Sequence, residues 1–368
     1  MTAIESFLGA GEGSEVLLHP DYIIVNDGPS SVALDYVRQV KDKDQVLVFH
    51  DHDVPTGSSS GAALYKRLNN FRKQYDLRFI AAKGIAYQHL VDEVVKPGEL
   101  VLGAGTHGSI YAAAGAVGLD VSAEALAQAI ETGEYAYTVP PTYSVKLEGS
   151  LPEGVLAYDA GLALRKLLQG KEQYALEISS SLCARDQAVV ASIVSECVQT
   201  VLFTDMDEAD EVLDLSKLKP MAMLPVDKRE DQAEAEIVEV SGLDLASFKA
   251  GQIGGYTAGT IEVLRRVRDN LKGKHVRFGF RLTIVPATSQ DYLKALEEGI
   301  ITDFIDFGAQ VVPFSDRSVV SQGAGVLGGT ERLLTTGLYT FTGCMGMLTS
   351  EVYSASSLQV ARAATGEY

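Results

Sequence analysis

Cysteine is scarce in this chain of 368 residues. It has only Cys183, Cys197 and Cys344, and no two of them form a C-x-x-C pair. Three scattered thiols do not make a disulfide framework. Iron–sulfur clusters are held by cysteine thiolates in closely spaced motifs, which this sequence lacks. We therefore expect each cysteine to be a small buried hydrophobic residue.

Long apolar runs and basic runs are missing as well. No apolar run reaches the roughly 18 residues that a membrane-spanning helix needs, and the amino terminus has no basic stretch followed by an apolar core. We therefore predict a cytoplasmic protein that does not enter a membrane. The formal charge is −18 without any Lys/Arg-rich run, which argues against nucleic acid as a partner. An acidic substrate would need a pocket that is locally positive or rich in backbone N–H groups.

The chain does contain an alternation of short apolar runs and helical stretches. The runs at residues 22–25, 46–49, 77–81 and 100–102 are bounded by Gly, Asp or Pro, while residues 62–75 carry apolar side chains near helical spacing. This alternation predicts an α/β fold with a largely parallel sheet. Such sheets bind ligands at the carboxyl ends of their strands, where the polar segments of this chain begin.

The length predicts more than one domain, because a single core stops growing at roughly 250–300 residues. Pro140 and Pro141 end a first unit, since two prolines cannot continue a helix. The charged residues 227–232 are interpreted as a solvated linker. We therefore predict domains at residues 1–140, 141–232 and 233–368. In the third we expect strands at 276–280 and 282–285 and a helix at 260–271.

Four polar residues, 50–53, follow one of the predicted strands. Alternation places His50 and His52 on one face and the two aspartates on the other. Two imidazoles on one face can bind a metal or share a proton. A plain polar network around the strand end is the structural alternative.

Residues 103–109, Gly-Ala-Gly-Thr-His-Gly-Ser, form a glycine-rich turn after another predicted strand. Its free N–H groups suit an anion, and His107 lies where a general acid or base could act. The turn lacks the dinucleotide fingerprint and the Walker lysine, so a nucleotide is not expected. In residues 58–61 we expect a serine hydroxyl to cap the start of a helix.

Taken together, the segments resemble a known family. Residues 48–55, 84–93 and 97–107 follow one another as in aconitase and the large subunit of isopropylmalate dehydratase. The resemblance continues through residues 133–140, 145–149, 154–159, 174–178, 253–259, 325–327 and 361–366, and so covers essentially the whole chain. It implies an aconitase-like α/β fold in which three α/β/α domains surround a central cleft. It also implies a lyase or isomerase for a small carboxylated metabolite.

The resemblance also implies site residues. The family's aspartate–histidine pair corresponds to Asp51 and His52, its active-site histidine to His107 and a site glutamate to Glu177, while its histidine before glutamine is Tyr87 here. We expect these five residues to handle protons. Substrate contacts are expected from seven further positions: Asp27, Ser30, Gln88, Thr106, Ser109, Tyr256 and Thr257.

Several departures from the family pattern concern its cofactor. The family usually carries a [4Fe-4S] cluster, whose iron acts on the substrate as a Lewis acid. Here the first ligand cysteine falls on Tyr256, and the C-x-x-C pair falls on Asp316 and Val319. We therefore expect no cluster, with the ring of Tyr256 either filling the vacated volume or simply packing. A single divalent metal held by His50, His52 and His107 is the alternative.

Other departures concern the substrate and the partner. The aspartate–serine before the family's histidine is Gly105-Thr106, and the arginine-rich substrate motif has become residues 338–344. Bidentate arginine is the common way to hold a carboxylate, and the candidates to replace it are Arg185, Arg281, Arg317 and Arg332. The family's swivelling domain would come from a small-subunit-like partner, unless the three domains act alone.

These observations leave three hypotheses. The first is a cluster-free hydro-lyase or isomerase that works by acid–base chemistry on a small carboxylated metabolite. The second is a non-catalytic binding or regulatory subunit that keeps the fold. The third is a mononuclear-metal hydro-lyase.

Overall fold

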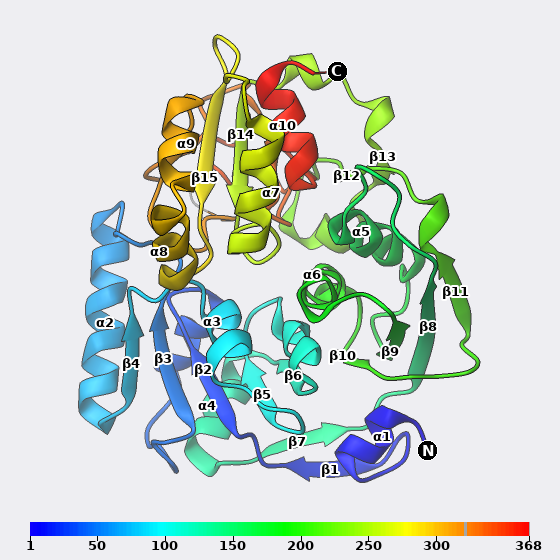
Figure 1. Cartoon of the computed structure of the whole chain (residues 1–368). Coiled ribbons are helices and arrows are strands. Elements are labelled where there is room, and N and C mark those ends of the chain that lie inside the picture. The colour runs from blue at the N-terminus through cyan, green and yellow to red at the C-terminus, as the bar shows by residue number, and fades with distance from the viewer. Residues whose placement is uncertain (320–321, 368) are drawn as a thin grey trace.

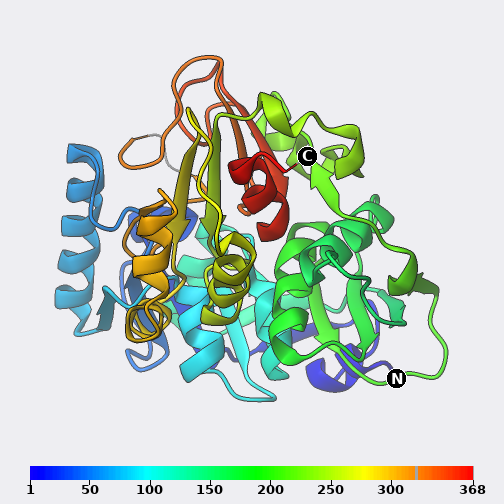
Figure 2. The same ribbon diagram turned by 45° about the horizontal axis from the view of Figure 1, so that its top comes forward.

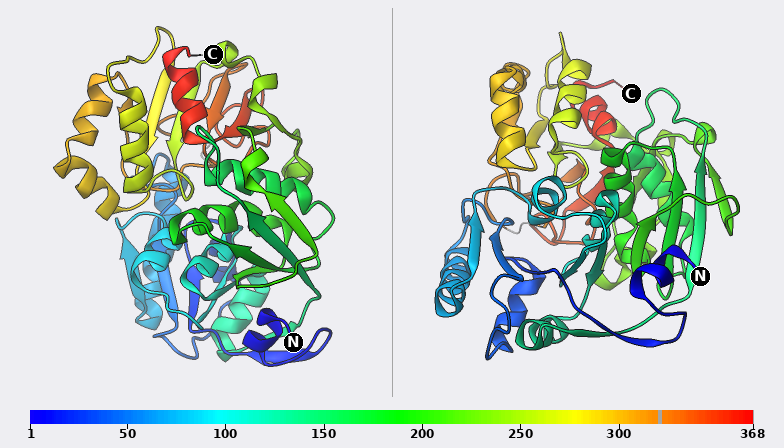
Figure 3. Two further views of the ribbon diagram at one scale, coloured as in Figure 1. Left: turned by 45° about the vertical axis from the view of Figure 1, so that its right-hand side comes forward. Right: turned by 60° about the horizontal axis from the view of Figure 1, so that its bottom comes forward.

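Three sheets organise the computed structural model, which describes residues 1–319 and 322–367. Figure 1 shows the blue-to-cyan sheet at the bottom, the yellow-to-red part above it and the green part to one side. Figures 2 and 3 keep the same arrangement from other directions. The predicted α/β fold class is confirmed. No helix in the described part of the chain is long and apolar enough to cross a membrane.

The first sheet is parallel, with the strand order β4-β3-β2-β5-β6. Its strands are β2 (Tyr22–Val25), β3 (Val46–His50), β4 (Arg78–Ala81), β5 (Leu100–Gly103) and β6 (Val117–Asp120). The crossovers are η1 (Pro29–Asp35), α2 (Ser59–Tyr75), α3 (Ala86–Glu93) and η2 (Gly108–Ala114), and α4 (Ala123–Thr132) follows the last strand. An antiparallel ribbon of β1 (Glu15–Leu18) and β7 (Tyr135–Thr138) lies beside α1 (Ala3–Leu8).

The first sheet is covered on both faces, which explains its uninterrupted apolar strands. Strand β3 is buried along its whole length. Val46 and Val48 join one core, while Leu47 and Phe49 join the other. As predicted, the hydroxyl of Ser58 caps α2 by accepting the N–H of Gly61 at 3.0 Å.

The second sheet is parallel in the order β10-β9-β8-β11. It contains β8 (Thr142–Glu148), β9 (Ala175–Ser180), β10 (Thr200–Phe203) and β11 (Glu211–Asp214). Its helices are α5 (Ala157–Leu167) and α6 (Ala184–Val194), with short turns at η3 (Ser195–Cys197) and η4 (Leu215–Lys217). The ring of His107 contacts this part of the molecule at Ser192 of α6.

The third sheet is mixed, in the order β13-β12-β18-β17-β14-β15-β16. Its strands are β12 (Met221–Met223), β13 (Ile237–Glu239), β14 (Ala250–Gly254), β15 (Arg281–Val285), β16 (Gln310–Val311), β17 (Arg332–Thr335) and β18 (Glu351–Ala355). Strand β12 runs antiparallel to β13 and β18. The helices are α7 (Ile261–Leu271), α8 (Ser289–Glu297), α9 (Ile300–Asp306) and α10 (Ser357–Thr365), and the turns are η5 (Arg229–Glu234), η6 (Val240–Gly242) and η7 (Leu245–Ser247).

Two local expectations for this third part were wrong. Residues 276–280 form a turn instead of a strand, because the side chain of Arg277 bonds the carbonyls of Ala363 and Phe248. The prediction of a solvated linker at residues 227–232 was right about exposure, since residues 227–231 are exposed, but wrong about a free connection. Gln232 is buried and bonds Leu338 and Thr340, which ties the segment to the protein.

The first and third sheets meet at the carboxyl ends of their strands. The N–H of Asp316 donates to the carbonyl of Asp51 at 2.7 Å, and Gly84 forms an isolated bridge with Thr288. Polar loops from both sheets are thereby brought together, as expected where strand ends converge.

Candidate active site

A cavity of about 890 Å³ lies between these loops. Six of the predicted site residues line it, and they come from both sheets: Asp27, His52, Tyr87, Thr106, His107 and Tyr256. Asp27 follows β2, His52 follows β3, and Thr106 and His107 follow β5. Tyr256 follows β14 of the third sheet. The cavity therefore forms from residues more than 200 positions apart.

His52 is held by carboxylates on several sides. Its Nδ1 lies 2.8 Å from Asp51 and 3.6 Å from Asp27, and its Nε2 lies 3.5 Å from Asp316. Burial alone would lower the pKa of His52, but these carboxylates outweigh it and hold that pKa well above its usual value. His52 is therefore an imidazolium at neutral pH.

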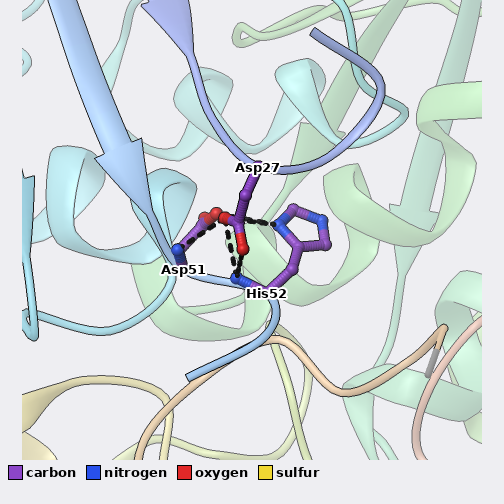
Figure 4. Close-up of side chains that lie close together, drawn as sticks. All are labelled: Asp27, Asp51 and His52. Carbon is purple, nitrogen blue, oxygen red and sulfur yellow. Dashed lines mark hydrogen bonds and ion pairs between the residues drawn. The ribbon is translucent and has the colours of Figure 1, made fainter. Parts of the chain in front are cut away.

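Asp27 fixes the loop that carries His52. Its carboxylate accepts the backbone N–H groups of Asp51, His52 and Asp53 at 2.7, 3.0 and 3.0 Å. Figure 4 shows how the three side chains Asp27, Asp51 and His52 converge at the ends of two neighbouring strands. Burial opposes ionisation of Asp27, yet bonding to His52 and its charge hold the Asp27 pKa well below the usual range. Asp51 in turn accepts the N–H of Ala86 at 2.8 Å, at the start of α3.

His107 lies in the opposite kind of environment. It is buried, its ring centroid lies 4.2 Å from that of Tyr256, and the backbone and hydroxyl oxygens of Ser192 lie 3.5 and 3.3 Å from its Nδ1. Burial lowers the pKa of His107, although Asp316 opposes the shift. His107 is therefore a neutral imidazole, and a proton on Nδ1 directed at Ser192 leaves Nε2 free as a base.

Two N–H groups of the glycine-rich turn beneath His107 already have a hydrogen-bond acceptor. The carboxylate of Asp120 accepts the N–H groups of Gly105 and Gly108 at 3.2 and 2.7 Å. The expectation that these N–H groups await a ligand is therefore wrong at these two positions. Asp120, which ends strand β6, was not among the predicted site residues because its role depends on the pairing of β6 with β5.

Tyr87 and Gly105 fit one another. A Cβ added at Gly105 would lie 1.9 Å from the Tyr87 hydroxyl oxygen. In the family pattern these positions hold histidine and aspartate, so the tyrosine ring here extends into the room that the aspartate side chain would need. Burial raises the pKa of Tyr87 well above its usual value, so its hydroxyl stays protonated.

The positions of the cluster ligands do not fit an iron–sulfur cluster. The hydroxyl of Tyr256 donates to Asp316 at 2.9 Å, and Val319 brings no ligand atom. No cysteine is among the described residues that line the cavity. Cys183 is exposed at the start of α6, while burial raises the pKa of Cys197 to about 11 and that of Cys344 to about 12. Thiolates therefore cannot be supplied here.

Of the three histidines proposed as ligands of a single metal, only His52 belongs to the group of potential ligands in the structure. Within the described ranges, the potential ligand group is Asp27, Asp51 and His52, which differs from the expected histidines His50, His52 and His107. His50 packs its ring edge-on against Tyr65, with centroids 4.8 Å apart. A metal needs a neutral imidazole, whereas the surrounding carboxylates favour protonated His52. The group is therefore a possible three-residue metal site only when His52 is deprotonated.

The remaining predicted residues lie outside the cavity wall. Ser30 bonds Asn26, Gln88 bonds Asp92, the N–H of Ser109 bonds Ser195, and Thr257 bonds the carbonyl of Thr336. Glu177 was expected to line the cleft, but it faces the amino terminus instead. Its carboxylate accepts the N–H of Ile4 at 2.8 Å. That N–H lies in the first turn of α1, where backbone N–H groups have no partner within their own helix.

The arginine that reaches the cavity is one the sequence did not suggest. Arg229 lines the cavity, while three of the four candidates pair with Asp92, Glu331 and Glu351 outside it: Arg185, Arg281 and Arg332. The fourth, Arg317, is buried and donates to the carbonyl of Ala324 at 2.9 Å. Arg229 was missed because it stands in the charged segment interpreted as a linker.

Comparison with known proteins agrees with this architecture. The chain is 28% identical over 391 residues to the 3-isopropylmalate dehydratase large subunit 2 of Archaeoglobus fulgidus, covering 97% of this chain and 93% of that one. It is 29% identical to the homoaconitase large subunit of Thermus thermophilus, with coverages of 97% and 92%.

A solved structure shares the fold. Aconitase X of Thermococcus kodakaraensis superposes with a TM-score of 0.55 at 10% identity, over 88% of this chain and 84% of that one. The sequence profile of the aconitase family (aconitate hydratase) matches residues 7–209. This match, spanning more than half of a chain whose sheets converge on one cavity, shows that the chain belongs to the aconitase family.

Proposed function

We propose that this protein is a hydro-lyase or isomerase that acts on a small carboxylated metabolite by acid–base chemistry without an iron–sulfur cluster. The observation that carries the proposal is the opposite surroundings of two histidines that line one cavity. His52 is charged because carboxylates surround it, and His107 is neutral because it is buried. Groups whose surroundings push their pKa values apart are suited to act as acid and base.

The two histidines would divide the elimination of water between them. His107 Nε2 takes a proton from the carbon next to the substrate hydroxyl carbon. The electron pair of the broken C–H bond forms the double bond while the C–O bond breaks. The imidazolium of His52 gives its proton to the departing hydroxyl, which leaves as water. If the unsaturated intermediate turns so that its two carbons exchange places, His107 returns the proton to one carbon and neutral His52 activates water for the other, which gives an isomer.

Support for a route without a cluster comes from the donor chemistry. In the family, iron polarises the leaving hydroxyl. Here Tyr256 and Asp316 bond each other at two of the ligand positions, and the Nε2 of His52 lies 3.5 Å from Asp316. An imidazolium can assist the same departure by proton donation.

The test is a turnover assay on a panel of 2- and 3-hydroxy carboxylic acids, followed by NMR in D₂O. We expect dehydration or isomerisation with deuterium incorporation at carbon, unaffected by air and by iron chelators. Activity that disappears in air and returns with ferrous iron and sulfide would contradict the proposal. So would activity that depends on one added divalent metal.

We further propose that a smaller protein completes the site. The proposal is supported by the names of the relatives reported above, which are large subunits. The assay is therefore run with and without a small-subunit candidate purified from the same cells. Tight ligand binding without turnover in either sample would favour a binding subunit instead.

A further inference from the structure

The segment that carries Arg229 is fixed against the part of the chain that replaced the family's arginine motif. Val226 donates its N–H to the carbonyl of Thr340 at 3.1 Å, and Thr342 donates its N–H to the carbonyl of Val226 at 3.0 Å. The Gln232 side chain donates to the Leu338 carbonyl at 2.8 Å and accepts the Thr340 N–H at 3.0 Å. Hydrogen bonds on both sides of Arg229 therefore fix the backbone segment that carries it.

The guanidinium of Arg229 rests on an aromatic ring and has its charge free. Its Cζ lies 5.7 Å from the centroid of Phe341, a residue of the replaced motif. In the parts of the chain that the structure describes, no carboxylate pairs with Arg229, whereas Arg281 and Arg332 each hold a glutamate. A stacked guanidinium keeps its N–H edge available for a planar bidentate partner.

Three acidic groups of the cavity wall are already engaged in hydrogen bonds. Asp27 accepts three backbone N–H groups, Asp53 accepts the N–H of Gly57 at 2.8 Å, and Asp316 accepts from Tyr256 and Ser318. The charge of His52 is likewise compensated by its aspartates. One uncompensated cation thus faces the cavity among the described wall residues. A second carboxylate on a ligand would lie near acidic residues and would have no cation to pair with.

The rest of the wall offers apolar surface. Val32, Leu64, Val121 and Val319 line the cavity. Val32 and Val319 remain 46% and 38% exposed, so each has apolar area without a protein partner. Burying such area on a ligand is favourable in proportion to the area removed from water.

We infer that Arg229 binds the single carboxylate of a monoanionic hydroxy acid whose remaining part is apolar. This inference rests on the proposed function, because that proposal makes the cavity the substrate site. It names a substrate class distinct from di- and tricarboxylic acids. It also gives the role of the lost arginine motif to a residue about 110 positions earlier in the chain.

The test is equilibrium binding to the full chain by isothermal titration calorimetry, which does not require turnover. The probes are 2-hydroxy-4-methylpentanoate, its neutral amide, malate and citrate. The variants are Arg229→Gln and, as matched control, Arg281→Gln, whose arginine pairs with Glu331 outside the cavity. We expect the monoanion to bind more tightly than the other three probes to the natural protein. Arg229→Gln should weaken its binding by roughly tenfold or more, since charged hydrogen bonds are lost, and should remove the preference over the amide.

Each other outcome counts against the inference. Equal binding of the monoanion to Arg229→Gln and to the natural protein would remove Arg229 from the site. Tighter binding of malate or citrate would overturn the monoanion class, and so would no binding of the monoanion. If the binding results are as expected but no hydroxy acid is converted, the proposed reaction fails while the carboxylate site stands.

Discussion

At the scale of single residues, the cavity depends on two histidines with opposite surroundings. His52 gains three carboxylate neighbours, while His107 gains an aromatic ring and a serine. The same side chain thus becomes a proton donor at one position and a proton acceptor at the other. The difference arises chiefly from Asp51 and Asp27 beside His52 and from the burial of His107.

The raised pKa of His52 predicts how stability depends on pH. A group whose folded pKa is raised contributes stability that is full below its unfolded pKa of about 6.5 and is lost as the pH rises through the folded value. Asp51→Asn removes the largest charge that raises the pKa. The stability advantage of the natural protein over this variant should therefore shrink between pH 6.5 and the folded pKa, by up to about 1.4 kcal/mol per pH unit. Urea unfolding from pH 6 to 9 measures it, and a constant difference would contradict the assignment.

The fit of Tyr87 to Gly105 predicts a coupled pair. Gly105→Asp should lower the free energy of unfolding by about 1–3 kcal/mol, because the new side chain meets the Tyr87 hydroxyl. Adding Tyr87→His should restore at least half of the loss. Gly242→Asp is the control, since a Cβ there meets nothing within 4 Å. Equal losses in the single and double variants would show that the two positions do not interact.

A loss of turnover on changing His107 is the residue-scale test of catalysis. His107→Ala should reduce the rate of conversion by about 10²–10⁴-fold, which is the usual range for a general acid or base. Circular dichroism and the monoanion titration serve as checks that the variant is folded and still binds. Full activity in such a folded variant would exclude His107 from the reaction.

The sequence alone predicted part of this site. Its polar segments after strands correctly indicated His52 and His107 as cavity residues, because strand ends converge in a parallel sheet. Glu177 was misplaced because the resemblance that implied its role does not show which segment covers its side chain, here the first turn of α1. Arg229 and Asp120 were missed because a charged loop and a strand-end aspartate become informative only through hydrogen bonds to distant segments.

At the scale of elements, the turn after β5 is organised by the last residue of β6. Asp120 accepts two N–H groups of that turn. Elements that form from local apolar patterns were predicted correctly, among them β2, β3, β5, α2 and α7. The missed turn at residues 276–280 follows from long-range bonds of Arg277, which no local pattern contains.

The Asp120 turn predicts a graded stability series. Asp120→Ala leaves two partly buried N–H groups without their acceptor and should cost about 1 kcal/mol for each. Asp120→Asn keeps one side-chain oxygen and should lose less. Urea unfolding compares both with Asp306→Ala, which changes an exposed aspartate. Identical stability of the alanine and asparagine variants would show that the carboxylate does not hold the turn.

At the scale of the whole molecule, the thiols are distributed away from the cavity. Cys183 is exposed, whereas Cys197 and Cys344 are buried with raised pKa values. A thiol reagent should therefore modify one cysteine rapidly in the native protein and three after unfolding. Mass spectrometry of labelled Cys183→Ser identifies the site. Rapid labelling of two or three thiols in the native state would contradict the described packing.

The contact between Tyr87 and Gly105 also constrains the evolutionary order of changes at this site. With an aspartate at position 105, a tyrosine at 87 would have no room for its hydroxyl. A lineage that starts from the family's histidine and aspartate must therefore lose the aspartate first. The return is ordered in the same way, because Tyr87 must change to a smaller side chain before an aspartate fits at position 105. The contact thus fixes the order of the two substitutions in either direction.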